Sequence, residues 1–247
     1  MIALARSLTI AAGICAILWS VSVFPVFRLE SPLSDAEQRI LSVETFNDAQ
    51  LDAIKGQLPQ SPDEHFSVSG SISSAVIRLR LLERELQSAQ ATDAPGLPAA
   101  ERAVQDALAK SPTNSYMWLA EYWLKHRRDE PVSDGLQLLD LSYRTGPNEG
   151  WIAQRRSPVA LSAFASLPKE LAQRSLSEFA GLVRSGLDAD AANILAGPGW
   201  PVREQLLRGL AQLDESDRRR FAHALEAKDL EEDVVVPGLE DRRRHPD

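Results

Sequence analysis

The sequence predicts an all-α protein, in which an N-terminal transmembrane helix is followed by a domain of helical hairpins. Three observations lead to this fold class. Residues 7–27 carry no charge. The chain after them holds short segments with apolar residues at helical spacing, and turns rich in Pro and Gly separate these segments. Segments that alternate apolar and polar residues, as strands do, are scarce.

The uncharged segment is the first element. At 1.5 Å per residue, about 20 residues cross the hydrocarbon core of a bilayer, so residues 7–27 predict a single-pass membrane anchor within a region 1–29. Arg6 lies before the segment, whereas the opposite charges of Arg28 and Glu30 after it cancel. The positive-inside rule then places the N-terminus in the cytoplasm and the rest of the chain on the periplasmic side of a bacterial inner membrane.

Two alternatives to the anchor stay open. Ser20-Val21-Ser22 supplies the small residues of a signal-peptide cleavage site, and cleavage there would also leave the remainder outside the cytoplasm. The other alternative is a buried helix of a cytoplasmic protein.

Residues 30–70 are interpreted as a linker with short helices, because Ser34 and Glu37 form a capping box before an apolar segment. Residues 71–228 are interpreted as one repeat-like domain of short helices. Caps, Pro and Gly place these at 71–90, 98–110, 112–128, 132–144, from Asn148, from Pro168, 188–195, 202–213 and from Asp214. Residues 229–247 are rich in charge, and we expect a disordered tail.

One part of this domain resembles tetratricopeptide repeats. Ala100, Val104, Ala107 and Pro112 follow that family's small, bulky, small and proline pattern, and Trp118 lies where the next repeat would begin. The pattern recurs more loosely at Gly135, Leu139, Ser142, Pro147 and Trp151. The resemblance covers about residues 71–155 and implies helical hairpins with a concave surface for a peptide or a partner helix. A generic α-solenoid fits these residues as well.

Composition excludes several functions. The net charge of −8 and the pI of about 5.1 argue against a nucleic-acid partner, because an acidic surface repels phosphates. Cys15 is the sole cysteine, so the chain has no intrachain disulfide and no thiolate metal cluster. The four histidines lack metal-ligand spacing, and nucleotide-binding and nucleophile motifs are absent. We therefore predict no cofactor, no metal, no catalytic residues and no enzymatic activity.

Aromatic residues concentrate at Trp118, Tyr122, Trp123 and Trp151. They are interpreted either as core packing between hairpins or as the partner-binding residues of a groove.

The leading functional hypothesis is a membrane-anchored interaction or scaffold module on the extracytoplasmic face, for example in envelope or exported-polysaccharide assembly. Its protein or peptide partner is not identified by the sequence. A second hypothesis is an accessory subunit of a membrane complex, which contacts another helix through the small residues Ala12, Gly13, Ala16 and Ser20. A third is an enzyme acting on the cell wall or a polysaccharide, which requires a polar cleft with convergent acids.

Overall fold

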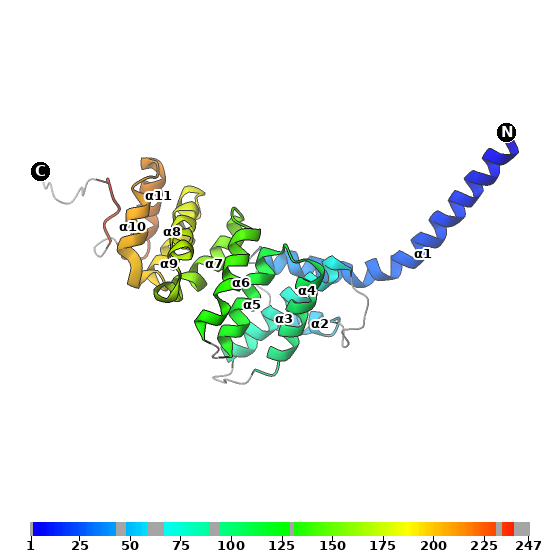
Figure 1. The fold of residues 1–247 in the computed structure, drawn as a ribbon, viewed down its shortest axis with the longest axis horizontal. Helices are drawn as coiled ribbons and strands as arrows, with labels where there is room; N and C mark the ends of the chain where they lie inside the picture. The colour runs from blue at the N-terminus through cyan, green and yellow to red at the C-terminus, as the bar shows by residue number, and fades with distance from the viewer. Residues whose placement is uncertain are drawn as a thin grey trace, which may run out of the picture. The chain divides into compact units, whose positions relative to one another are not determined.

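The computed structural model describes residues 2–42, 48–58, 67–88, 94–128, 131–230 and 234–239, and within these ranges it is all helical without a strand (Figure 1). The all-α prediction is confirmed. Residues 43–47 and 59–66 of the predicted linker, and 231–233 and 240–247 of the predicted tail, lie outside the described residues. The chain divides into two compact units, Met1–Pro112 and Thr113–Asp247, whereas the sequence suggested a single domain over residues 71–228.

Unit 1 is built around the third helix. It contains α1 (Ile2–Leu41), α2 (Asp48–Lys55), α3 (Val68–Ser88) and α4 (Leu97–Lys110). The helix α3 packs against the other three, so that its consecutive residues Ala75, Val76 and Ile77 are all buried. It is antiparallel to α4, because Lys110 Nζ at the end of α4 donates to Ser71 Oγ at the start of α3 over 2.7 Å.

The predicted transmembrane helix is not supported. Among the residues that the structure describes, no helix combines the length and the apolar character that crossing a membrane requires. The prediction was based on the absence of charge in residues 7–27, but an uncharged stretch can still hold polar residues such as Ser20 and Ser22. The extracytoplasmic location is tested by none of these observations and stays a prediction.

The predicted helix start at Ser34 is wrong as well. The helix α1 continues unbroken past this residue to Leu41, so its capping box does not begin a new helix. Leu33, Ala36 and Ile40 are buried instead, at the spacing of one helical face. The same part of α1 contacts α3, since Glu37 accepts a hydrogen bond from the Ser73 hydroxyl over 2.6 Å.

Unit 2 is a series of short helices. These are α5 (Ser115–Arg127), α6 (Val132–Thr145), α7 (Gly150–Ser162), the 3₁₀ turn η1 (Phe164–Ser166), α8 (Lys169–Arg184), α9 (Asp188–Ala196), the 3₁₀ turn η2 (Trp200–Val202), α10 (Arg203–Leu210) and α11 (Glu215–Glu226). Asn114 caps α5, since its side-chain oxygen accepts a hydrogen bond from the backbone N–H of Met117 at 3.0 Å.

Small residues let α5 and α6 approach closely. A Cβ on Gly135 would lie 2.8 Å from the Tyr122 ring, and Ser142 is fully buried. The hydroxyl of Ser115 donates to the backbone oxygen of Ser142 at 2.7 Å, and the hydroxyl of Ser142 donates to the backbone oxygen of Ser115 at 2.9 Å. These pairs make α5 and α6 an antiparallel hairpin. Close approach requires small residues in any helical hairpin, so the resemblance to tetratricopeptide repeats stays a prediction.

The second half of unit 2 has its own apolar core. Phe179 of α8 and Phe221 of α11 meet edge to face with ring centroids 5.9 Å apart, among buried residues of α9 and α10. Val234 and Val236 are buried in the same core, although they lie in the tail that we expected to be disordered. The apolar character of Val234 and Val236 therefore determines their burial, although charged residues surround them in the sequence.

Candidate functional site

A buried arginine holds four helices of unit 2 together. Arg156 of α7 is fully buried. Its Nη1 donates to the backbone oxygen of Ser142 at 2.7 Å and lies 3.3 Å from the hydroxyl of Ser115, while its Nη2 donates to the backbone oxygen of Gly146 at 3.0 Å. The arginine thereby closes the end of α6: it adds a donor to the Ser142 carbonyl, which also accepts from the Gly146 N–H, and it satisfies the Gly146 carbonyl beyond the helix.

Glu178 of α8 neutralises this arginine. Its Oε2 accepts from Nε of Arg156 at 2.9 Å and also from Nη2. Its Oε1 accepts from the Tyr143 hydroxyl at 3.2 Å and from the Ser157 hydroxyl at 3.1 Å. Both oxygens are therefore occupied, as an ionised buried carboxylate requires.

Tyr143 completes the network. Its ring lies 4.1 Å from the guanidinium carbon of Arg156, in cation–π geometry. Burial raises the pKa of the Tyr143 hydroxyl well above its ordinary value, and the adjacent Glu178 carboxylate raises that pKa further. The hydroxyl therefore stays protonated at neutral pH and keeps donating to Glu178.

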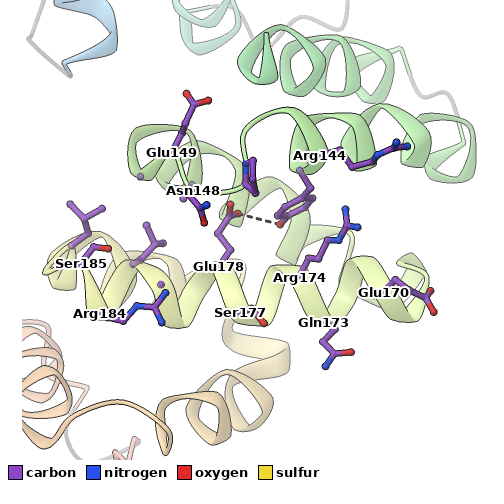
Figure 2. Close-up of a pocket in the computed structure, with 17 residues that line it drawn as sticks. Arg144, Asn148, Glu149, Glu170, Gln173, Arg174, Ser177, Glu178, Arg184 and Ser185 are labelled. Carbon is purple, nitrogen blue, oxygen red and sulfur yellow. Dashed lines mark hydrogen bonds between the residues drawn. The ribbon is translucent and has the colours of Figure 1, made fainter. Parts of the chain in front are cut away.

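Two residues of this network, Tyr143 and Glu178, line the floor of an open cavity, which we call the α8 groove (Figure 2). Its volume is about 900 Å³. It is lined by Tyr143, Arg144, Pro147, Asn148, Glu149, Gly150, Ala153, Glu170, Gln173, Arg174, Ser177, Glu178, Gly181, Leu182, Arg184, Ser185 and Leu187. One wall is α8, and the other is the end of α6 together with the start of α7.

A polar face of α8 makes the groove. Glu170, Gln173, Arg174, Ser177 and Arg184 recur at the spacing of one helical face, and all of them are exposed. The opposite face of α8 is buried through apolar residues, including Leu171, Phe179 and Val183. The polar face is therefore left uncovered by the packing that fixes the helix. Figure 2 shows Arg184 and Ser185 at one end of this row and Glu170 at the other.

The four aromatic residues singled out in the sequence line another part of unit 2. Tyr122 is buried against Gly135, as core packing requires. Trp118 and Trp151 are partly buried and pack against the apolar core formed by α5, α6 and α7. Trp123 is partly buried, with the guanidinium of Arg127 5.5 Å from its ring. None of the four lines the α8 groove.

Sequence reasoning did not find the groove residues. Arg156 and Glu178 lie 22 residues apart, and no local spacing connects them. A usable signal was present in α8, where polar residues recur opposite the apolar positions that identified the helix. That signal identifies an exposed face and does not by itself indicate a cavity.

The groove has the chemistry of a binding surface. Asn148 and Gln173 carry amide groups that donate and accept hydrogen bonds, which suits a peptide backbone. Both oxygens of Glu178 already accept hydrogen bonds from four donors within the protein. Among the described residues, no three His, Cys, Asp or Glu side chains gather as a metal site would require.

Comparisons with protein-family models, with curated proteins and with solved structures give no match to this chain. The functional argument therefore depends on the geometry of the groove.

Proposed function

We propose that unit 2 is a protein-interaction module that binds an extended segment of a partner protein along the α8 groove. The single observation behind the proposal is the exposed polar face of α8, which borders a cavity of about 900 Å³ and is covered by no other described element of unit 2. This proposal keeps the interaction hypothesis of the sequence and moves its site from the aromatic residues to α8.

The length of the groove suits a peptide. The helix α8 has 16 residues, which corresponds to about 24 Å at 1.5 Å per residue. An extended chain advances about 3.3 Å per residue, so about seven residues would follow the helix from end to end. Pockets for small molecules enclose most of their ligand and are mainly apolar, whereas polar exposed side chains run the whole length of this groove.

The rigidity of the floor also supports binding. The side chain of Glu178 is held by Arg156, Tyr143 and Ser157, so the middle of the groove has one fixed shape. A fixed surface loses little conformational entropy when a ligand binds. Ser177 and Gly181, which lie beside Glu178 on α8, are small and leave room for a peptide backbone.

The proposal is tested by selecting random nine-residue peptides on phage against the purified full-length chain. The same selection is run on Ser177→Trp, which fills the middle of the groove. The matched control is Gln205→Trp, an exposed glutamine of α10 outside the groove. We expect the wild type and the control to enrich the same peptides, and we expect Ser177→Trp to lose them while keeping its helical circular-dichroism spectrum.

Two outcomes contradict the proposal. One is that no peptide is enriched by the wild type. The other is that Ser177→Trp binds the enriched peptides as well as the control does, because binding would then take place elsewhere on the chain.

A further inference from the structure

The groove contains three exposed arginines, and they differ in their ion pairs. Arg174 Nη1 lies 2.9 Å from the Asp140 carboxylate, and Arg144 Nη1 lies 3.8 Å from the same carboxylate. Arg184, the last residue of α8, has no carboxylate within ion-pair distance among the described residues. Among the three arginines of the groove, Arg184 is thus the one whose positive charge no described carboxylate neutralises.

The position of Arg184 directs this charge into the groove. Its Nη2 lies 3.9 Å from the place that a Cβ on Gly181 would occupy, and Gly181 is a lining residue. Glu149 lines the groove too, but its Oε1 lies within 2.8 Å of the Cβ position of Gly146, at the end of α6. The Glu149 carboxylate therefore lies beside the end of α6.

An apolar recess lies at the same end of the groove. It is formed by Gly150 and Ala153 of α7 together with Leu182 and Leu187. Leu187 is half-buried and lines the groove, and its Cδ1 lies 3.7 Å from the place of a Cβ on Gly150, so a side chain added at Gly150 would contact this leucine. The recess is an apolar surface beside a cation.

The end of α8 keeps the recess in place. Gly186 has φ of +77°, a left-handed conformation that glycine adopts without strain. The backbone N–H of Leu187 then donates to the oxygen of Leu182 at 3.0 Å, and that of Gly186 donates to the oxygen of Val183 at 3.1 Å. This is the Schellman ending of a helix, which brings Leu187 back against Leu182.

We infer that the partner segment carries an aliphatic side chain next to an aspartate or glutamate, with the aliphatic group in the recess and the carboxylate on Arg184. The inference rests on the proposed function and specifies its ligand. An arginine presents its N–H groups as a planar fork that matches a carboxylate, and such charge-assisted hydrogen bonds select one charge over the other. Among the described residues, no carboxylate at this end of the groove forms an ion pair with Arg184, so the carboxylate has to come from the partner.

The test uses the same random nine-residue library with three further variants of the full-length chain. Arg184→Glu reverses the charge, and Arg208→Glu is the matched control, an exposed arginine of α10 that lies outside the groove. Gly150→Leu fills the recess from the first turn of α7. We expect the wild type and Arg208→Glu to enrich Asp or Glu beside Leu, Ile or Val.

The two groove variants should change this preference in different ways. Arg184→Glu should enrich Lys or Arg in place of the acid, a reversal that an unfolded protein cannot produce. Gly150→Leu should lose the aliphatic preference and keep the acidic one. A synthetic enriched peptide should bind the wild type about tenfold more weakly when its Asp is replaced by Asn. The same replacement should strengthen binding to Arg184→Glu, because it removes the repulsion between two carboxylates.

The outcomes separate the inference from the function. If Ser177→Trp blocks the enriched peptides but these contain no acidic–aliphatic pair, the inference is overturned and the interaction module stands. If Arg184→Glu and Arg208→Glu select the same peptides, the inference is overturned in the same way. If the wild type enriches no peptide that Ser177→Trp blocks, the proposed function fails and the inference fails with it.

Discussion

The two units bury polar side chains in different ways. In unit 1, the helix α3 buries serines, and α1 brings carboxylates to two hydroxyls: Glu30 accepts from the Ser67 hydroxyl at 2.6 Å, and Glu37 accepts from the Ser73 hydroxyl at 2.6 Å. In unit 2, Arg156 and Glu178 are buried as a charged pair. A hydroxyl needs one or two hydrogen bonds, whereas a buried charge needs a partner of opposite sign and all of its hydrogen bonds.

This difference is related to the faces that the helices leave open. The helix α3 is enclosed by α1, α2 and α4, and its polar groups fasten neighbouring helices. The helix α8 is fastened on one face by its apolar core and at its middle by Glu178, and its remaining polar face stays exposed. In unit 2, the single buried Arg156–Glu178 pair thus fixes the middle of α8 and leaves its polar face exposed. In unit 1, several hydrogen bonds along α3 join it to its neighbours, and these neighbours cover it.

The largest effect is expected from removing one member of the buried charge pair. Glu178→Ala should lower the free energy of unfolding of unit 2 by about 3–5 kcal/mol, because Arg156 would remain charged and buried. Urea unfolding followed by tryptophan fluorescence measures this, since four of the five tryptophans lie in unit 2 and the fifth, Trp19 of α1, is exposed in the folded chain.

Two controls sharpen this prediction. Glu170→Ala, an exposed carboxylate of the same helix, should change the free energy of unfolding by no more than about 0.5 kcal/mol. Arg156→Met combined with Glu178→Leu should recover more than half of the loss, because no unpaired charge remains. A loss below about 1 kcal/mol for Glu178→Ala would show that the pair does not fix the middle of α8.

The next largest effect is expected at Gly146, which lies close to Ser115 at the end of α6. A Cβ on Gly146 would lie 2.6 Å from both the Cβ and the Oγ of Ser115, so Gly146→Ala should destabilise unit 2 by about 1–3 kcal/mol in the same urea experiment. The matched control is Gly209→Ala in α10, where nothing lies within 4 Å of the added Cβ. That variant should be neutral or more stable by up to about 1 kcal/mol, since alanine favours helix. Equal effects at both glycines would contradict the account.

A smaller effect is expected at the start of α3. Glu30 Oε1 accepts from the Ser67 backbone N–H at 2.6 Å, so Glu30→Ala should leave this donor unsatisfied and cost about 1–2 kcal/mol of local stability. Amide hydrogen exchange in the first turn of α3 measures the loss. Asp35→Ala, an exposed carboxylate of α1, is the control and should leave that exchange unchanged. Faster exchange in both variants would mean that the loss of charge on α1, and not the Ser67 contact, is responsible.

The smallest effect depends on pH. Burial raises the pKa of Glu37, although the Ser73 hydroxyl opposes this shift by donating to the carboxylate. The contribution of Glu37 to stability is therefore fully present below the ordinary glutamate pKa of about 4.3 and is lost as the pH rises through the higher pKa of the folded state. Glu37→Gln should remove this part of the pH dependence. Hydrogen exchange of α3 amides across pH 4–7, corrected for intrinsic rates, should be flatter in the variant, and identical slopes would disprove the assignment.

Local signals predicted most of the helices, because their ends are set by neighbouring residues. Pro98 lies in the first turn of α4, and Gly146 ends α6, as expected from the sequence. The prediction from the capping box at Ser34 was wrong, because the burial of Leu33 and Ile40 in the folded unit favours a continuous helix over a local cap.

The site depended on contacts that local signals do not contain. Arg156, Tyr143 and Glu178 come from three helices, and only the packing of those helices makes a charged pair beneath a cavity. The aromatic residues attracted attention because they are rare in this chain. Tyr122 nevertheless belongs to the core, whereas the groove is lined by common residues such as Gln173 and Ser177.

The most direct test of the central claim is amide hydrogen exchange of the full-length chain with and without a peptide selected on it. We predict added protection in α8 and in the segment from Gly146 to Gly150, with α10 and α11 unchanged. Protection confined to α5 and the start of α7, where Trp118, Trp123 and Trp151 lie, would contradict the groove and assign binding to the aromatic residues.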